Sequence, residues 1–353
     1  MINMSRLRYV ASFFFPICAW LGFQWGGIWA WMSPLVAFGL VPLAELLTAG
    51  TEANLDDAGQ AAARDARFYD WLLYALVALQ WLLVLSFLYA VNTVEMSGLH
   101  LAGSVVSLGL CCGAFGINVG HELGHRPGRA DQRLAVAALT SSLYVHFFVE
   151  HNRGHHAKVA TAEDPATARK GETLYAFWLR SVRDSYRSAW RLERERLARK
   201  GRGWLAWGNL TLRHQLLQWG VVIALAAAFG LEAVGLFMAA AVLGFLMLET
   251  VNYVEHYGLT RAAKDDGRYE RVRPVHSWNS NHPLGRVLLF EVTRHSDHHA
   301  HPGRRYPLLR HFDEAPQLPA GYPGMMLLSV VPPLFFRVMD PRVERALRTR
   351  QAA

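Results

Sequence analysis

The stretch "LHLAGSVVSLGLCCGAFGINVGHELGHR" (residues 99–126) joins a long apolar run to a short motif rich in histidine. Residues 99–120 contain no Asp, Glu, Lys or Arg. They are about long enough to cross the hydrocarbon core of a bilayer, which takes ~20 residues of helix. The run then ends in His121-Glu122-Leu123-Gly124-His125. This stretch predicts a transmembrane helix that carries two histidines to one face of a membrane.

Further apolar runs of similar length lie on both sides of this stretch. Hydrophobic residues make up 52% of the 353 residues, and a soluble core of this size rarely hides so much apolar surface. The N-terminal run shows no clear signal-peptide cleavage site. We therefore expect an all-α membrane protein with about six transmembrane helices and a histidine-rich cytoplasmic cap. Besides 99–120, the predicted spans are 9–27, 29–48, 69–91, 213–230 and 233–254, the first two joined by a Gly26-Gly27 turn.

Basic residues predict which side of the membrane each segment occupies. The links 92–98 and 231–235 contain no Lys or Arg, whereas residues 126–202 contain sixteen and the chain after Arg213 contains fifteen. The positive-inside rule places both basic segments, and both termini, in the cytoplasm. Because most of the 36 Lys and Arg residues lie in these two segments, the net charge of +8 indicates membrane topology and not nucleic-acid binding.

The apolar run 133–149 is predicted to be a helix at the cytoplasmic interface. If it crossed the membrane, His121 and His151 would lie on opposite faces, about 30 Å apart. The resulting organisation has helices 1–4 in 1–120, a cytoplasmic histidine region in 121–212, helices 5–6 in 213–256 and a cytoplasmic C-terminal region in 257–353. Within the first of these regions, residues 180–202 predict a basic amphipathic helix that lies on anionic lipid or docks an acidic partner.

Most of the sixteen histidines fall in four clusters that the topology places on one side of the bilayer. Side chains at i, i+3 and i+4 share a helical face and can converge on a metal. One zinc of a protease takes three protein ligands, so this set is better explained by two metal ions. Imidazole suits Zn, Cu, Fe and Ni alike, so the element stays open at this point. The clustered histidines are His121, His125, His151, His155, His156, His256, His295, His298 and His299.

Five carboxylates lie beside these histidines in the sequence. We expect them to accept hydrogen bonds from ligand rings and so to set the tautomer of each ring. The alternative is that one of them is itself a direct or bridging ligand. They are Glu122, Glu150, Asp164, Glu255 and Asp297.

The motifs "NVGHELGHR", "EHNRGHHAKVATAEDPATARKGE", "NYVEHYGLTR", "HSWNSNH" and "RHSDHHAHPGRRYPLLR" resemble those of the integral-membrane alkane 1-monooxygenases. More distantly, they resemble xylene-type methyl hydroxylases and the histidine-box fatty-acid desaturases. The resemblance implies two non-haem iron ions held by the nine histidines, with His146 and His301 outside the set. It also implies O₂-dependent hydroxylation of the terminal methyl of medium- to long-chain n-alkanes in a bacterial cytoplasmic membrane.

The resemblance further implies rubredoxin as the electron donor, with a rubredoxin reductase upstream. The three cysteines form no C-x-x-C pair, which excludes a fused rubredoxin and predicts a separate donor protein. Rubredoxins are generally acidic, so arginines near the ligand motifs are candidates for docking. These are Arg126, Arg129, Arg304 and Arg305.

A linear alkane offers no polar group, so a channel between helices must orient it by shape. We expect the residues that limit its length on the second span, at Ala37 and Phe38. The alternative functions are an aromatic-methyl or fatty-acid hydroxylase or a desaturase with the same centre, an intramembrane zinc protease with Glu122 as base, and a metal carrier or transporter. A zinc protease would leave most of the histidine set unexplained. A transporter would leave the position of the set at one face of the membrane unexplained.

Overall fold

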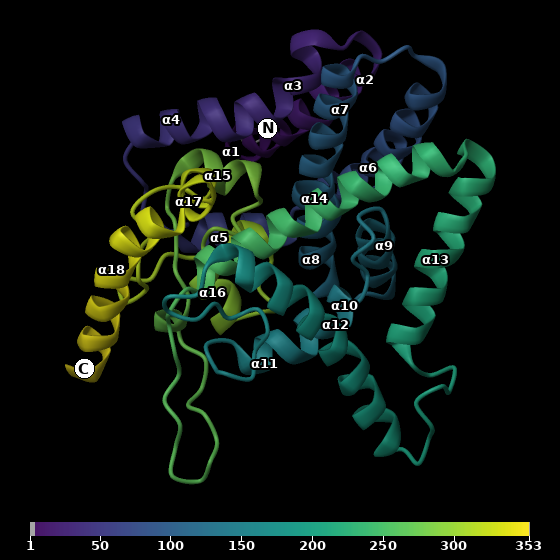
Figure 1. Ribbon diagram of the computed structural model, residues 1–353. Helices are drawn as coiled ribbons and strands as arrows, with labels where there is room; N and C mark the ends of the chain where they lie inside the picture. The colour runs from purple at the N-terminus through teal and green to yellow at the C-terminus, as the bar shows by residue number, and fades with distance from the viewer. Residues whose placement is uncertain (1–3, 353) are drawn as a thin grey trace. The chain divides into compact units, whose positions relative to one another are not determined.

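The computed structural model describes residues 4–352, and these form helices joined by loops (Figure 1). Within this range there is no β-strand, and the isolated bridges Ala263–Tyr269 and Asn279–Gln317 are the extended pairings recorded there. The expectation of an all-α protein is confirmed.

The chain divides into two compact units, each made of segments distant in sequence. The first unit comprises Met1–Gly39, Arg67–Asn152 and Tyr186–Leu248. The second comprises Leu40–Ala66, Arg153–Ser185 and Glu249–Ala353.

Five helices of the described chain are long and apolar enough to cross a membrane. They are Gly27–Leu47 (α3, η2 and α4), Phe68–Thr93 (α6), Gly98–Gly124 (α7, η3 and α8), Leu210–Phe229 (α13) and Leu231–His256 (α14). The remaining expected span, 9–27, is helical but divided into the 3₁₀ segment η1 (Arg8–Phe13) and α2 (Phe14–Trp25). α2 alone has 12 residues and rises about 18 Å, less than a bilayer core requires, but η1 runs directly into it and adds six residues at about 2 Å each.

In the first unit, small residues allow helices to approach closely. The predicted turn is present: Gly26 and Gly27 have φ of 63° and 54°, which L side chains rarely adopt. A Cβ on Gly22 would lie 2.8 Å from the Ala30 Cα across this hairpin. Likewise, a Cβ on Gly244 of α14 would lie 2.6 Å from the Cys112 Cβ at the start of the π-helical segment η3 (Cys112–Ile117). Such contacts are typical of helices that associate in lipid.

The apolar run 133–149 was predicted to be one interfacial helix. In the structure it forms two short helices. These are α9 (Arg129–Thr140) and α10 (Phe147–Glu150), separated by a turn in which Leu143 has a φ of 52°. Neither helix is long enough to cross a bilayer. The break lets Leu139, Tyr144 and Phe147 pack together against Phe245 of α14.

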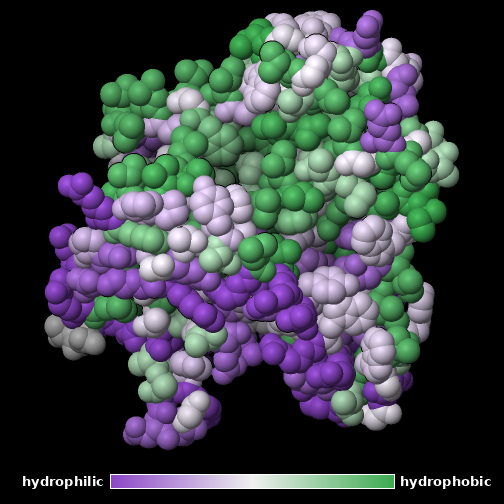
Figure 2. Space-filling view, viewed as in Figure 1, coloured by the Kyte–Doolittle hydropathy of each residue, from purple (hydrophilic) through white to green (hydrophobic). Residues whose placement is uncertain are grey.

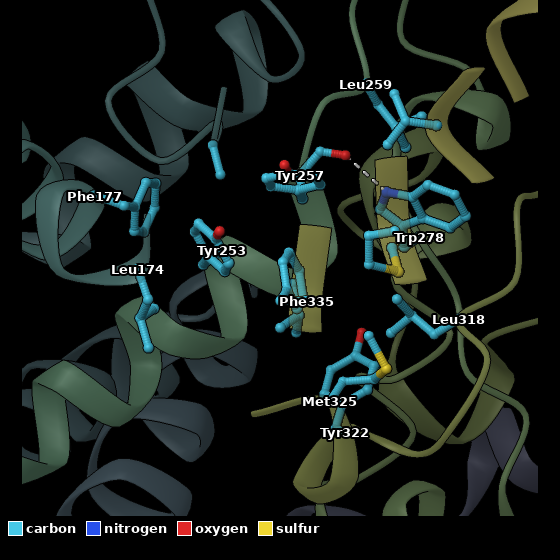
Figure 3. Close-up of a cluster of buried hydrophobic side chains, with 14 residues drawn as sticks. Leu174, Phe177, Tyr253, Tyr257, Leu259, Trp278, Leu318, Tyr322, Met325 and Phe335 are labelled. Carbon is cyan, nitrogen blue, oxygen red and sulfur yellow. Dashed lines mark hydrogen bonds between the residues drawn. The ribbon is translucent and has the colours of Figure 1, made fainter. Parts of the chain in front are cut away.

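The second unit has its own aromatic core, which lies beside the end of α14 (Figure 3). Tyr253 and Tyr257 pack there against Phe335 of α18 (Pro332–Ala352). Trp278 is 2% exposed and donates its indole N–H to the Tyr257 carbonyl at 3.0 Å. The remaining helices of this unit are α5 (Asp57–Asp65), α11 (His156–Lys158), α15 (Pro283–Leu288), α16 (His295–Ala300) and α17 (Tyr322–Ser329), with 3₁₀ turns η5 (Pro274–His276) and η6 (Tyr306–Leu308).

Large apolar side chains are exposed along the membrane-length helices, as the green areas of Figure 2 show. Trp71 and Leu82 of α6, and Trp219 and Ile223 of α13, are each about half exposed or more. Exposed apolar surface on this scale indicates contact with lipid. By contrast, α12 (Leu174–Ala198), which covers most of the predicted amphipathic helix 180–202, carries many charged residues.

Candidate metal centre

Three of the predicted ligands meet in the first unit. His121 lies on α8 (Asn118–Gly124), His125 follows directly after it, and His151 begins the π-helical segment η4 (His151–His155). Each offers a ring nitrogen within 4.8 Å of the other two, and the Nε2 atoms of His125 and His151 are 3.1 Å apart. Single π-helical turns such as η4 occur frequently at functional sites.

Four other predicted ligands converge in the second unit. His256 ends α14, His295 and His299 lie one turn apart on α16, and His155 ends η4. All four are buried, and each offers a ring nitrogen within 4.8 Å of the other three. The Nε2 atoms of His155 and His299 are 3.2 Å apart, and those of His295 and His256 are 3.1 Å apart. We call this set the four-histidine site.

The donors of the four-histidine site fit a transition-metal ion. Metal–nitrogen bonds of about 2.1 Å place neighbouring ligand nitrogens roughly 3.0–3.4 Å apart, which matches the observed spacing. Burial lowers the pKa of His299 well below its ordinary value, and the adjacent His295, His156 and His155 rings lower it further. A neutral ring keeps the lone pair that binds a metal.

The other two predicted ligands form a pair in the same unit. The Nε2 atoms of His156 and His298 are 3.1 Å apart, and the His156 ring also lies near His299. His146 and His301, which the prediction leaves out, contact other groups: His146 lies between the Tyr144 and Tyr186 rings, and His301 donates to Asp297.

Asp164 contacts a ligand ring in the manner expected. Its Oδ2 lies 2.9 Å from His155 Nδ1 and also accepts a hydrogen bond from the Thr167 hydroxyl at 2.6 Å. Burial raises the pKa of Asp164, but its interactions with His155 and Thr167 outweigh this, so the pKa is lowered and the group is a carboxylate. A carboxylate at Nδ1 keeps the ring proton there and leaves Nε2 free to bind a metal.

Glu255 faces the Nε2 side of a ligand ring, whereas Asp164 faces the Nδ1 side of one. Its Oε2 is 3.2 Å from His295 Nε2, the nitrogen that also faces His256. The carboxylate therefore lies among the donor atoms and not behind the ring. This position matches the alternative in which one carboxylate is a direct ligand.

The remaining carboxylates have partners of other kinds. Asp297 is fully buried and accepts hydrogen bonds from the His301 ring, the Arg304 guanidinium and the Arg310 N–H, which secures the chain after α16. Glu122 accepts a hydrogen bond from Arg126 at 3.1 Å. Glu150 is buried and precedes His151 directly.

The predicted docking arginines differ in their availability. Arg126 is largely buried and pairs with Asp70 at 2.7 Å as well as with Glu122, and Arg304 pairs with the buried Asp297. Arg129 is exposed, whereas Arg305 is half-buried and donates to the Arg64 carbonyl at 2.7 Å. Two of the four charges are therefore already neutralised inside the protein.

The predicted channel residues Ala37 and Phe38 lie in the π-helical segment η2 (Val36–Leu40) and are half-buried. The structure also shows partners that sequence reasoning did not single out. Thr167, three residues after Asp164 within the motif "ATAEDPAT", bonds to that carboxylate. Trp278, within the motif "HSWNSNH", donates its backbone N–H to the carbonyl of Glu255 at 2.8 Å.

Comparison with known proteins agrees with this geometry. The pattern that describes the fatty acid desaturase family matches residues 96–329. The chain is 40% identical to alkane 1-monooxygenase 2 of Pseudomonas aeruginosa, over 97% of this chain and 93% of that protein. It is 37% identical to alkane 1-monooxygenase of Ectopseudomonas oleovorans, over 97% and 86% respectively.

A more distant relative is the xylene/toluene monooxygenase hydroxylase component of Pseudomonas putida, at 29% identity over 95% of this chain and 88% of that protein. The histidine groups, the membrane-length helices and this full-length similarity lead to one assignment. The chain belongs to the alkane 1-monooxygenases, within the histidine-rich membrane family whose desaturase pattern it matches.

Proposed function

We propose that this protein hydroxylates the terminal methyl of medium- to long-chain n-alkanes in a bacterial cytoplasmic membrane, with its active site and both termini in the cytoplasm. The overall reaction consumes one alkane, one O₂, two electrons and two protons, and yields one 1-alkanol and one water. The observation that carries the proposal is the four-histidine site in a chain about 40% identical to alkane 1-monooxygenases.

The proposed ligands of two iron ions are the nine predicted histidines. The four-histidine site supplies donors for one ion, and the other five histidines are sufficient in number for a second. Bound iron would supply the activation of O₂ that no side chain can supply. The chain contributes neutral imidazoles with fixed tautomers, through contacts such as that of Asp164 with His155.

The alkane is held by shape and dispersion, since it offers no group for a hydrogen bond. We propose that Ala37 and Phe38 help to set the length of its channel. In Ala37→Trp, the larger ring should shift product formation toward shorter alkanes, measured by gas chromatography over a series of chain lengths. An unchanged chain-length profile would contradict this assignment.

Electrons are proposed to come from a separate rubredoxin, reduced by a rubredoxin reductase. The deciding experiment measures metal content of the purified protein and then alkane oxidation dependent on NADH, O₂, rubredoxin and its reductase. About two irons per chain and a primary alcohol support the proposal, whereas one zinc per chain overturns it.

A related methyl hydroxylase is the second candidate, because the chain is also 29% identical to the xylene/toluene enzyme component. Product analysis with octane, dodecane, xylene and a fatty acid separates these activities and tests fatty-acid desaturation as well. A zinc protease that uses Glu122 as base gains no support, since that carboxylate is paired with Arg126.

A further inference from the structure

A basic groove lies along one face of α18 in the second unit. It encloses a cavity of about 390 Å³ between α18 and the segment 313–317. Arg342, Arg345 and Thr349 of α18 line it at i, i+3 and i+7, the spacing of one helical face. Arg273 and Arg350 also line the groove, and Trp278 contributes to its wall.

The charge of the groove is positive in excess. Four arginines line it against two carboxylates, Asp313 and Glu314, and one of the four, Arg350, is paired with Glu270. Arg273 pairs with Glu314 at 3.1 Å, but both side chains are about half exposed, so this ion pair contributes little to the stability of the fold. Arg345 is exposed, and Arg342 is half-buried, donating to the Val338 carbonyl within its own helix. An acidic protein surface would complement such a groove.

Trp278 connects this groove to the four-histidine site. Its backbone N–H donates to the carbonyl of Glu255 at 2.8 Å, and its indole N–H donates to the carbonyl of Tyr257 at 3.0 Å (Figure 3). These two residues flank His256, a member of the four-histidine site. One aromatic side chain and one turn of α14 therefore separate the groove from a proposed iron ligand.

We propose that this groove docks a small acidic one-electron carrier protein, whose electrons reach the four-histidine site through Trp278 and the backbone of His256. The inference rests on the proposed function, in which each turnover consumes two electrons. The carrier is oxidised by one electron at each of two encounters, and O₂ is reduced. One of its oxygen atoms enters the C–H bond of the alkane, and the other leaves as water with two protons from solvent.

The docking surface is tested by charge reversal on α18. In Arg342→Glu/Arg345→Glu, the KM for reduced rubredoxin should rise about tenfold or more, with little change in kcat, because complementary charge acts on encounter. The matched control is Arg337→Glu/Arg348→Glu, which reverses two exposed arginines of the same helix that do not line the groove and should leave KM within about twofold. Equal KM changes in both double variants, or none in either, would overturn the docking site.

The electron path is tested at Trp278. Stopped-flow absorbance follows the reoxidation of rubredoxin by the full-length enzyme with Trp278 and with Trp278→Phe or Trp278→Tyr. Slower reoxidation in the phenylalanine variant than in the tyrosine variant, at unchanged KM and iron content, supports the path. Equal rates, or a rate loss that tracks iron loss, overturn it.

A single turnover separates this inference from the proposed function: the enzyme is reduced by dithionite without oxygen, freed of excess dithionite, and then given alkane and O₂. Arg342→Glu/Arg345→Glu should retain this single turnover, since the small reductant does not need the groove. If the unmodified enzyme holds iron but oxidises no alkane with either reductant, the proposed function fails. If the unmodified enzyme is active and the groove variants behave like it with rubredoxin, the function stands and the docking inference fails.

Discussion

Replacing Asp164 with asparagine tests how the chain prepares a metal ligand. Asp164 Oδ2 interacts with the His155 ring and accepts from the Thr167 hydroxyl, while Oδ1 accepts from the Ala166 N–H at 3.2 Å. An asparagine must turn its NH₂ group toward one of these two sides. If the NH₂ group faces Ala166, it meets the backbone N–H of Ala166, which is also a donor. Facing His155, it meets the ring N–H and favours the tautomer with the proton on Nε2, which then cannot bind a metal.

The size of the effect follows from the bond that is lost. A hydrogen bond to a charged group is worth about 1.5–3 kcal/mol, and loss of the partner of a metal-binding histidine typically weakens metal binding about 10–100-fold. The hydrogen-bond energy and the loss of metal affinity agree in size, since a tenfold change in affinity corresponds to about 1.4 kcal/mol. We therefore expect Asp164→Asn to weaken Fe²⁺ binding about 10–100-fold with its helical content retained.

The assay is anaerobic competition for Fe²⁺ between the detergent-solubilised protein and a chromogenic chelator, with circular dichroism to monitor folding. Asp340→Asn is the matched control, because Asp340 accepts a hydrogen bond from the Tyr257 hydroxyl at 2.7 Å and not from a histidine. Unchanged affinity in Asp164→Asn, or an equal loss in both variants, would refute the proposed role of the carboxylate.

Three further predictions concern packing, pH and metal removal. Gly244→Ala should lower the free energy of unfolding by about 1–3 kcal/mol, because its Cβ would lie 2.6 Å from the Cys112 Cβ; Gly235→Ala, with open space around it on the same helix, is the control in chemical denaturation. Burial lowers the pKa of His146 to about 3, so the unfolded state binds more protons than the folded state below the ordinary histidine pKa of about 6.5. Stability should therefore fall as pH drops from about 6.5 toward 3, by up to about 1.4 kcal/mol per pH unit from this residue. His146→Phe should flatten the pH dependence of the thermal midpoint, and an equal slope in both proteins would contradict that reasoning. Removing iron with a chelator should lower the thermal midpoint, since bound metal at a hundred times its Kd contributes about 2.7 kcal/mol; re-adding Fe²⁺ should restore it in the unmodified protein and not in His256→Ala, and a midpoint insensitive to iron would argue against a metal at this site.

Hydropathy and local spacing predicted most of the helices and of the candidate ligands. A span is recognised from ~20 contiguous residues, and the i, i+3 and i+4 spacing of His295, His298 and His299 is a property of one short helix. The first expected span and the run 133–149 were predicted less well. A 3₁₀ segment divides the first, and the left-handed Leu143 breaks the second where packing against Phe245 favours a turn.

The sequence by itself determined that the chain is helical and apolar and that it carries clustered imidazoles, because composition and periodicity belong to neighbouring residues. Only the tertiary structure decided which charged groups are available. Arg126 and Arg304 look alike in the sequence as docking charges, yet each is neutralised by a carboxylate. The groove beside α18 joins segments more than sixty residues apart, with Trp278 against the turn that carries His256. Such pairings depend on which distant segments pack together, and a buried charge must find its partner there because water cannot supply one.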